Sequence, residues 1–400
     1  MLPTSLKDDF PILRETVNGK PLVYLDNAAT THNPTQVLEA SRKYYEHLNS
    51  NIHRGTHHLA RAATDAHEKA RETISRHLNA AAPEEVIFTS GTTDSINLVA
   101  NILTLQPGDE ILISTLEHHS NIVPWQMLAE RSGASLKVIP CNEEGVLDQG
   151  AFRNLLSDKT KILALTWISN AFGTVNPVAE MAAEARKVGS LILLDAAQAI
   201  PHLQIDVQSL PVDFIAFSGH KIYAPTGIGI LWGRKELLET LPPWRGGGEM
   251  IKEVTFEHTT YNDLPFKYEA GTPNIEGGIA LAAAIDYVNS IGLEEIYSHE
   301  KTLIQQAAAA LSEIPGIYLF GPEDRVGALS FAIEGVHHYD LGTLIDQMGV
   351  AVRTGHHCCQ PLMARFGITG TTRASFALYN TEQDIDSLAT AVKKAAMMLS

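Results

Sequence analysis

The amino-acid sequence predicts an α/β protein with a large, mostly parallel β-sheet and a second, smaller α+β domain. Short apolar segments alternate with helical patterns between about residues 60 and 231. This alternation ends after the stretch LPPWRGGGEM, residues 241–250, where a different pattern begins. The chain has 400 residues, which is too long for a single small hydrophobic core, so two domains are expected.

The large sheet is predicted from apolar segments of strand length that share a high content of β-branched and aliphatic residues. They are residues 84–90, 109–114, 135–140, 161–169, 190–196, 213–219 and 227–233. Strands of this kind that alternate with helices are typical of a parallel sheet covered on both faces. Ligands of such sheets bind beyond the carboxyl ends of the strands, so polar residues directly after these segments are candidate site residues.

The C-terminal part has a different organisation. A long helix-like segment, residues 274–314, leads into short strands such as residues 326–335. A last helix is predicted over residues 381–399, because Thr381 suits an N-cap and acidic residues follow in the first turn. We expect residues 1–20 to pack on the smaller domain, residues 21–262 to form the large domain and residues 263–400 to form the small domain.

The composition excludes several classes of partner. The formal net charge of -16 repels phosphate backbones and anionic lipid headgroups, so neither nucleic acid nor a membrane surface is expected as a partner. Three cysteines are too few for a secreted disulfide framework. The first residues lack a signal-peptide pattern, and the most apolar run is interrupted by Asp195, so a cytoplasmic location is expected.

Lys221 directly follows the apolar segment 213–219 within the motif SGHK. An amine buried there would lose proton affinity and become available for a Schiff base with a carbonyl compound. The alternative is a lysine whose charged end extends to the surface.

Asp195 ends a segment with the pattern of a central strand, where an ionised carboxylate needs a cationic partner. The protonated ring nitrogen of pyridoxal phosphate would be such a partner, and the pairing would help the ring to withdraw electrons from a substrate. Gln198, one helical turn later, is suited to bind the phenolic oxygen of the ring. A carboxylate that caps the next helix is the alternative.

A phosphate site is predicted where the segment 84–90 is followed by Gly91, Thr92 and Thr93 at the start of a helix. Ser218 and His220, next to Lys221, would complete the phosphate contacts. For this motif taken alone, helix capping without a ligand is the favoured explanation of the hydroxyl groups.

Two further groups of residues are suited to the substrate. His118 and His119 follow the segment 109–114, where an imidazole would stack on a cofactor ring and move protons, unless the pair is only solvated. Arg373, in TTRASF, would bind an amino-acid carboxylate through two hydrogen bonds, or would form a structural salt bridge.

The motif RTGHHCCQPLM places Cys358 and Cys359 in a loop beside Arg353, His356 and His357. Positive neighbours lower the pKa of a thiol and increase its nucleophilic fraction, so a reactive cysteine is predicted. A zinc site is the rival interpretation, but four adjacent residues do not easily converge on one tetrahedral ion, and no metal is expected.

These motifs together resemble the SufS-type cysteine desulfurases, a group within the class V branch of pyridoxal-phosphate enzymes. The resemblance extends over nearly the whole chain, from YLDNAATT and NSNIHRGTHHL through DAAQA and SGHKIYAPTGIG to EAGTPN, RTGHHCCQPLM and RASFALYNT. It implies the type I fold of pyridoxal-phosphate-dependent transferases, which is aspartate-aminotransferase-like.

The resemblance also implies a role for each matching residue. Lys221 would be the Schiff-base lysine, Cys358 would accept the sulfur, and His118 would stack on the ring and assist catalysis. The remaining cofactor contacts would come from Asp195, Gln198, Thr92, Thr93, Ser218, His220 and Thr272. The substrate contacts would come from Asn170, Arg373, Arg353, His53 and Arg54.

The family is a homodimer whose site is shared, so Thr272 is expected to reach the phosphate of the other subunit, and His53 and Arg54 to line this pocket. The predicted reaction converts L-cysteine to L-alanine and leaves a persulfide on Cys358. A SufE-like or SufU-like protein would receive the sulfur for iron-sulfur cluster assembly. Selenocysteine lyase activity is also compatible with the resemblance.

Cys359 departs from the family pattern, in which a small residue follows the catalytic cysteine. It is interpreted as a bystander or as a second sulfur acceptor. Other reactions with the same cofactor, such as an aminotransferase or a sulfinate desulfinase, stay open, as does a non-catalytic sulfur-carrier scaffold.

Overall fold

The computed structural model describes residues 1–399 and contains a sheet of seven strands. The strand order is β4-β10-β9-β8-β7-β5-β6. These strands are β4 (Val86–Thr89), β5 (Glu110–Ser114), β6 (Ser135–Ile139), β7 (Thr160–Thr166), β8 (Leu191–Asp195), β9 (Phe214–Ser218) and β10 (Gly229–Gly233). All seven segments predicted as strands are therefore confirmed. β10 runs antiparallel to both of its neighbours, whereas the pairs from β9 to β6 are parallel.

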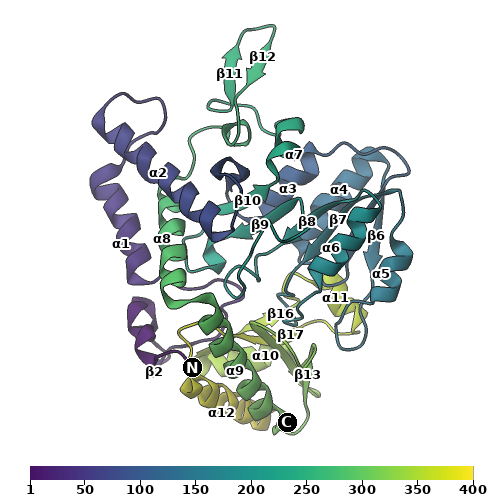
Figure 1. The fold of residues 1–400 in the computed structure, drawn as a ribbon. Coiled ribbons are helices and arrows are strands. Elements are labelled where there is room, and N and C mark those ends of the chain that lie inside the picture. Colours follow the sequence, from purple (N-terminus) through teal and green to yellow (C-terminus); the bar gives the residue numbers. More distant parts are fainter. Residues whose placement is uncertain (400) are drawn as a thin grey trace.

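The helices of the chain surround this sheet and continue into the C-terminal part (Figure 1). They are α1 (Thr35–Lys43), α2 (His58–His77), α3 (Thr92–Ile102), α4 (Val123–Ser132), α5 (Gln149–Leu155), α6 (Val178–Lys187), α7 (Lys235–Thr240), α8 (Ile275–Ile291), α9 (Leu293–Ser312), α10 (His338–Gln347), α11 (Gln360–Arg365) and α12 (Glu382–Leu399). Among residues 1–399, no helix has the length and apolarity needed to cross a membrane.

The two faces of the large sheet contribute to separate hydrophobic cores. In β8, Ile192 and Leu194 belong to one core, while Leu193 belongs to the other. This division follows from the strand period of two, which sends successive side chains to opposite faces. Both faces are covered, so the strands consist of nearly continuous apolar residues.

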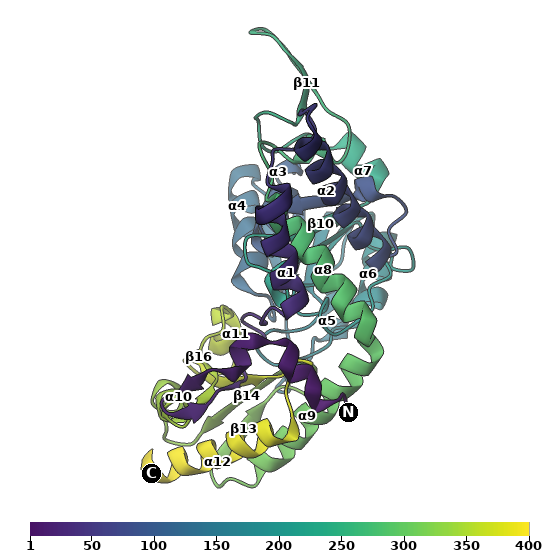
Figure 2. The same cartoon turned by 90° about the vertical axis from the view of Figure 1, so that its left-hand side faces the viewer.

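A second, antiparallel sheet lies in the C-terminal part, with the strand order β13-β14-β17-β16. Its strands are β13 (Ile317–Phe320), β14 (Ala328–Ile333), β16 (Arg353–Gly355) and β17 (Thr371–Ser375). Figure 2 shows this sheet together with α9, α10 and α12 at one end of the molecule. The hairpin of β11 (Ile251–Val254) and β12 (Thr259–Tyr261) projects from the opposite end.

The segment predicted as helical from residue 274 to residue 314 consists of two helices. α8 and α9 are separated by Gly292, whose φ of 101° falls where residues with a side chain are strained. α8 packs against α1 and α2 of the N-terminal half. The predicted helical segment is therefore interrupted at a single glycine.

The N-terminal residues contact the C-terminal part at several points. Lys7 forms an ion pair of 3.2 Å with Asp384, and the backbone N–H of Leu2 donates to Nδ1 of His299. β3 (Val23–Tyr24) pairs with β15 (Val350–Ala351), although β3 lies in the stretch assigned to the large domain. The predicted domain boundaries stay predictions.

Gly173 joins the loop after β7 to the second sheet. Its φ is 71°, and its carbonyl oxygen accepts a hydrogen bond of 2.9 Å from the backbone N–H of Val326. A Cβ atom at this position would lie 2.6 Å from the carbonyl oxygen of Ala328. Only glycine therefore permits the loop after β7 to approach the second sheet so closely.

We expect Gly173→Ala to lower the free energy of unfolding by about 3 kcal/mol, because left-handed strain and overpacking add together. Gly189→Ala is the matched control, since Gly189 has a φ of 81° and a Cβ added there would have no neighbour within 4 Å. That control should lose about 1 kcal/mol, from backbone strain alone. Urea unfolding followed by circular dichroism measures both values, and equal losses would refute the packing argument.

Candidate active site

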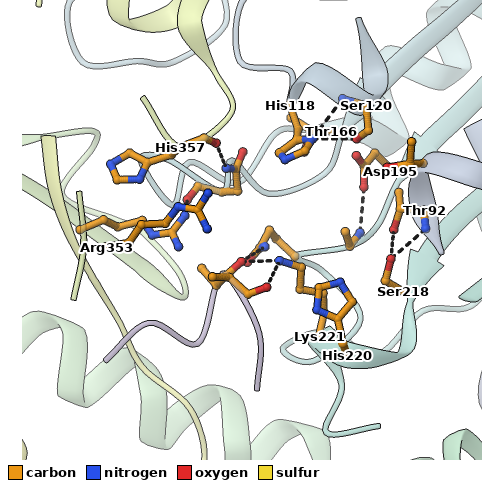
Figure 3. Close-up of a pocket in the computed structure, with 17 residues that line it drawn as sticks. Thr92, His118, Ser120, Thr166, Asp195, Ser218, His220, Lys221, Arg353 and His357 are labelled. Carbon is orange, nitrogen blue, oxygen red and sulfur yellow. Dashed lines mark hydrogen bonds between the residues drawn. The ribbon is translucent and has the colours of Figure 1, made fainter. Parts of the chain in front are cut away.

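A cavity of about 240 Å³ opens at the carboxyl ends of the central strands (Figure 3). It brings together eleven of the residues that the sequence predicts for the site. They are Thr92, Thr93, His118, Asn170, Asp195, Gln198, Ser218, His220, Lys221, Arg353 and Arg373. The segments after β4, β5, β7, β8 and β9 all contribute, together with β16 and β17 of the second sheet.

Asp195 is the last residue of β8 and is buried, with 3% of its surface exposed. One oxygen, Oδ1, accepts a hydrogen bond of 3.0 Å from the backbone N–H of Ala197. Burial disfavours the charged form and raises the pKa of Asp195 to about 6. A cation or a strong donor in the cavity would therefore be stabilised by this carboxylate.

Lys221 follows β9 and extends into the cavity. Its Nζ donates to the carbonyl oxygens of Ala28, at 2.5 Å, and Ala29, at 2.7 Å. Burial, helped by the nearby guanidinium groups of Arg373 and Arg353, lowers the pKa of Lys221 to about 7. A large fraction of this amine is therefore uncharged and nucleophilic near neutral pH.

The start of α3 lies against the end of β9. The backbone N–H of Thr92 donates to Oγ of Ser218 at 2.8 Å, and the two hydroxyl oxygens lie 2.7 Å apart. Gly91 has a φ of 152°, and a Cβ added there would lie 3.1 Å from Oγ of Ser218. Backbone donors and hydroxyl groups at a helix N-terminus are suited to an anion such as a phosphate.

His118 lies at the cavity wall and is neutral at physiological pH, because burial lowers its pKa to about 4. Nδ1 accepts a hydrogen bond of 3.1 Å from the backbone N–H of Ser120. The proton of the imidazole is therefore on Nε2. His118 presents a neutral ring with one N–H group.

Arg373 is fully buried and holds two neighbouring segments. Nη1 donates to the carbonyl oxygen of Asn170 at 2.8 Å, and Nη2 forms an ion pair of 2.9 Å with Asp26. Arg373 therefore forms a structural salt bridge and also lines the cavity. Part of its guanidinium already has partners within the chain, and its predicted contact with a substrate carboxylate stays a prediction.

Cys358 lies in a loop next to the cavity. Its thiol is half-buried, and Nη2 of Arg353 is 3.9 Å from its sulfur. His357 and Cys358 have φ values of 51° and 57°, which is a strained conformation for residues with side chains. The backbone N–H of His119 donates to the carbonyl oxygen of Cys358 at 2.8 Å.

Cys359 is fully buried, and burial raises the pKa of its thiol to about 12. A protonated thiol without access to the cavity is a poor nucleophile. This geometry argues against the interpretation of Cys359 as a second sulfur acceptor. Within residues 1–399, no group of three or more His, Cys, Asp or Glu residues is arranged to hold a metal ion.

Besides Cys358, which lies next to the cavity, three predicted residues lie outside the cavity of this chain. Thr272 is exposed and lines a separate hollow with Thr89 and Ser90. His53 lies between two carboxylates, with 2.9 Å separating its ring nitrogens from both Glu68 and Glu249.

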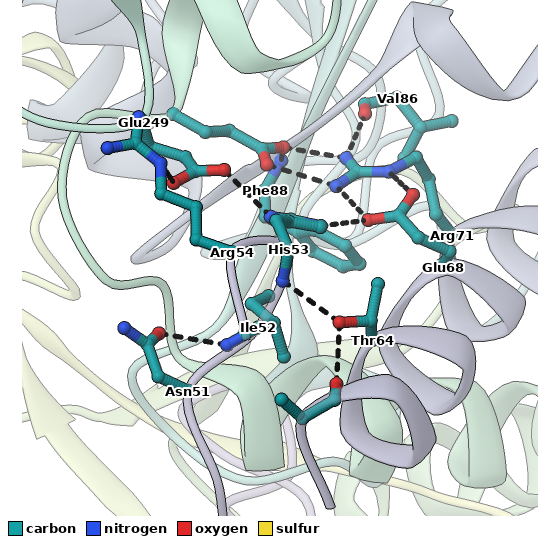
Figure 4. Close-up of polar contacts among 12 residues, drawn as sticks. Asn51, Ile52, His53, Arg54, Thr64, Glu68, Arg71, Val86, Phe88 and Glu249 are labelled. Atoms are coloured by element: carbon teal, nitrogen blue, oxygen red, sulfur yellow. Dashed lines mark hydrogen bonds and ion pairs between the residues drawn. The ribbon is translucent and has the colours of Figure 1, made fainter. Parts of the chain in front are cut away.

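Arg54, the residue after His53, contacts the same group of charged side chains (Figure 4). Nε of Arg54 lies 3.4 Å from Glu249. The hydrogen bond with Glu68 raises the pKa of His53. These residues form a charged cluster of their own, and their predicted contact with substrate stays a prediction.

Part of the cavity wall was not predicted from the sequence. The segment Asp26 to Ala29 contributes two carbonyl oxygens to Lys221, and Thr166 and Ser120 also line the cavity. Thr166 ends β7 and pairs in register with Asp195, so its position at a strand end was a usable signal. Backbone carbonyl groups, in contrast, have no signature in a sequence.

The residues of the cavity fit pyridoxal phosphate. They supply an amine with a lowered pKa, a buried carboxylate able to pair with a ring nitrogen, and a helix N-terminus with hydroxyl groups for a phosphate. A neutral imidazole beside them has the shape to stack on a ring.

Comparison with known proteins agrees with this geometry. The family Aminotransferase class-V matches residues 23–388. A probable cysteine desulfurase of Halalkalibacterium halodurans is 50% identical, over 97% of this chain and 97% of that protein. The cysteine desulfurase of Dickeya dadantii is 46% identical, over 98% of this chain and 97% of its own length.

Among solved structures, the cysteine desulfurase CsdA of Escherichia coli superposes with a TM-score of 0.93 and 41% identity, over 100% of both chains. This likeness confirms the predicted type I fold of pyridoxal-phosphate-dependent enzymes, and pyridoxal phosphate is the cofactor of the protein. The match to one family over most of the sequence, with the same fold throughout, means that the chain belongs to the Aminotransferase class-V family.

Proposed function

We propose that the protein is a cysteine desulfurase, which converts L-cysteine to L-alanine and transfers the sulfur to Cys358. The observation that carries the proposal is the combination, at one cavity, of Lys221 with a pKa of about 7, the buried Asp195 and the adjacent half-buried thiol of Cys358. An aminotransferase needs the first two groups but has no use for the thiol.

Lys221, Asp195, Gln198 and His118 would hold pyridoxal phosphate, with Thr92, Thr93, Ser218 and His220 at its phosphate. When bound, the cofactor withdraws electrons from the α-carbon of the substrate. Asp195 supports this effect through its buried carboxylate.

The other steps use side chains of the chain itself. Arg373, Asn170 and Arg353 are suited to hold the substrate carboxylate. Lys221 would remove the α-proton as a neutral amine, and the ammonium so formed would return a proton to the carbon skeleton, a transfer that the Nε2–H of His118 would assist as a hydrogen-bond donor. The thiolate of Cys358 attacks the substrate sulfur, so that an S–S bond forms, the C–S bond breaks and the carbon takes up a proton to give alanine.

We further propose the finer assignments that the sequence motifs favour. The protein would be of the SufS type, located in the cytoplasm, and would pass its persulfide sulfur to a SufE-like or SufU-like acceptor for iron-sulfur cluster assembly. Selenocysteine would be an alternative substrate, because its selenium occupies the same position as the cysteine sulfur.

A homodimer with a shared active site accounts for the residues that lie outside the cavity. Thr272 is exposed on the single chain, and Arg54 has 62% of its side chain exposed. A second copy would bring Thr272 to the phosphate, and His53 and Arg54 to the substrate. Sedimentation as a monomer would contradict this assignment.

We expect the purified protein to release alanine from L-cysteine in the presence of a reductant, and Cys358→Ala to reduce this release to background. The reason is that the substrate C–S bond breaks only when a thiolate accepts the sulfur. Alanine is quantified by chromatography, together with the persulfide on Cys358 by mass spectrometry.

Cys141→Ala is the control, because Cys141 is a buried free thiol in the hydrophobic core. It should retain the activity of the wild type. Alanine release that survives in Cys358→Ala would favour a sulfinate desulfinase, and no release from the wild type would favour an aminotransferase or a non-catalytic carrier.

We expect the capture of pyridoxal phosphate by the cofactor-free protein to accelerate as the pH rises through about 7 and then to level off. The pKa of Lys221 is about 7, so its amine is protonated and unreactive below that pH and neutral above it. The rate is followed by the absorbance of the bound cofactor between about pH 5.5 and pH 9, a range that brackets this pKa.

Arg353→Gln should move the midpoint to higher pH, because it removes one of the cations that lower the pKa of Lys221. Lys221→Ala should show no covalent capture at any pH. A midpoint near about 10 in the wild type, the value of an ordinary lysine, would contradict the prediction.

A further inference from the structure

Cys359 contacts the side chain of Asn170 from behind the Cys358 loop. Its sulfur lies 3.1 Å from Oδ1 of Asn170 and 3.5 Å from the carbonyl oxygen of His357. The high pKa of this buried thiol means that it stays protonated and serves as a hydrogen-bond donor. The shorter contact gives Asn170 a donor for its carboxamide oxygen.

The nitrogen end of the Asn170 carboxamide also contacts the loop that carries Cys358. Nδ2 donates to the carbonyl oxygen of His357 at 2.7 Å, an interaction that appears as the dashed line beside His357 in Figure 3. The backbone oxygen of Asn170 accepts from Arg373 at 2.8 Å. Asn170 therefore connects the wall of the cavity to the loop that carries Cys358.

The loop needs such a connection because its backbone is strained. His357 and Cys358 are consecutive residues with side chains in the left-handed region, with φ values of 51° and 57°. Such a conformation persists only where surrounding contacts hold it in place. Two of these contacts reach the loop through Asn170 and Cys359.

An amide nitrogen carries two hydrogens, and one hydrogen of Asn170 Nδ2 is engaged by His357. The second remains for a ligand in the cavity, which Asn170 lines. Fixing the oxygen of the carboxamide fixes the direction of this second N–H group as well. The orientation of the amide thus affects both the loop and the substrate side of the cavity.

We propose that Cys359 is a positioning residue, whose thiol orients the carboxamide of Asn170 and thereby holds both the Cys358 loop and a substrate-binding N–H group. The inference deepens the proposed function and rests on it, since it assigns a role at the same site. It replaces the interpretation of Cys359 as a bystander, and it gives the thiol no part in sulfur transfer.

The first test compares Cys359→Ala, which removes the donor, with Cys359→Ser, which retains one, in the cofactor-loaded enzyme. We expect Cys359→Ala to lower kcat/KM for L-cysteine by about three- to tenfold, the effect of one hydrogen bond, mainly through KM. Cys359→Ser should restore most of the loss. If Cys359→Ser loses as much as Cys359→Ala, the thiol acts by filling space and the inference is wrong.

A double-mutant cycle with Asn170→Ala tests whether Cys359 acts through Asn170. In that background, Cys359→Ala should cause no further loss of kcat/KM, because the partner of the thiol is already gone. Independent, additive losses would overturn the proposal. Cys141→Ala, the buried thiol away from Asn170, is the matched control and should match the wild type in each assay.

Amide hydrogen exchange provides a readout that does not depend on activity. Exchange of the peptide 354–362, followed by mass spectrometry, should be faster in Cys359→Ala than in the wild type and unchanged in Cys359→Ser and Cys141→Ala. Unchanged exchange in Cys359→Ala would overturn the inference. If the wild type releases no alanine, the proposed function fails, and the exchange result alone decides the role of Cys359.

Discussion

The carbonyl oxygens of Ala28 and Ala29 lie within 2.7 Å of the amine of Lys221, and the segment that carries them joins the two halves of the molecule. Asp26 in the same segment pairs with Arg373 of the second sheet, and the carbonyl oxygen of Ala28 also accepts from Gln198. A shift of this segment would alter the lysine, the arginine and the glutamine together. The geometry of the cavity depends on its position more than on any single catalytic side chain.

Burial shifts the pKa values of the acid and the amine in the cavity in opposite directions, and both shifts move the pKa toward neutral pH. It raises the pKa of Asp195 to about 6 and lowers that of Lys221 to about 7, so both groups lie close to the point where they exchange a proton. The same desolvation keeps His118 neutral. Groups with such pKa values change charge at little cost during a reaction at neutral pH.

The sequence was sufficient to predict the strands of the large sheet and most of the cavity, because functional side chains directly follow buried apolar strands. Asp195 and Lys221 were found in this way. The contributions of Ala28 and Ala29 could not be found, since they are made by backbone atoms. The break at Gly292 was also missed, because the apolar pattern continues across it.

The sequence could not separate the environments of the two adjacent thiols. It placed Cys358 and Cys359 in one loop and left Cys359 as a bystander or a second sulfur acceptor. The left-handed turn at His357 and Cys358 directs successive side chains to different sides, so that Cys358 is half-buried and Cys359 fully buried. Two neighbours in a sequence can therefore differ completely in environment, and only tertiary structure separates them.

This difference in burial between the thiols determines which cysteine of the folded protein reacts first with an oxidant. Cys141 and Cys359 are both buried, whereas Cys358 is only half-buried. The chain has no other cysteine. Oxidation to sulfenic acid and beyond follows thiol exposure, so damage would begin at the sulfur of Cys358. The thiol of Cys359 is buried and protonated, which makes it a slow partner for disulfide formation with an oxidised Cys358. Occupation of Cys358 by sulfur, or its reaction with an external thiol, would protect the protein more readily.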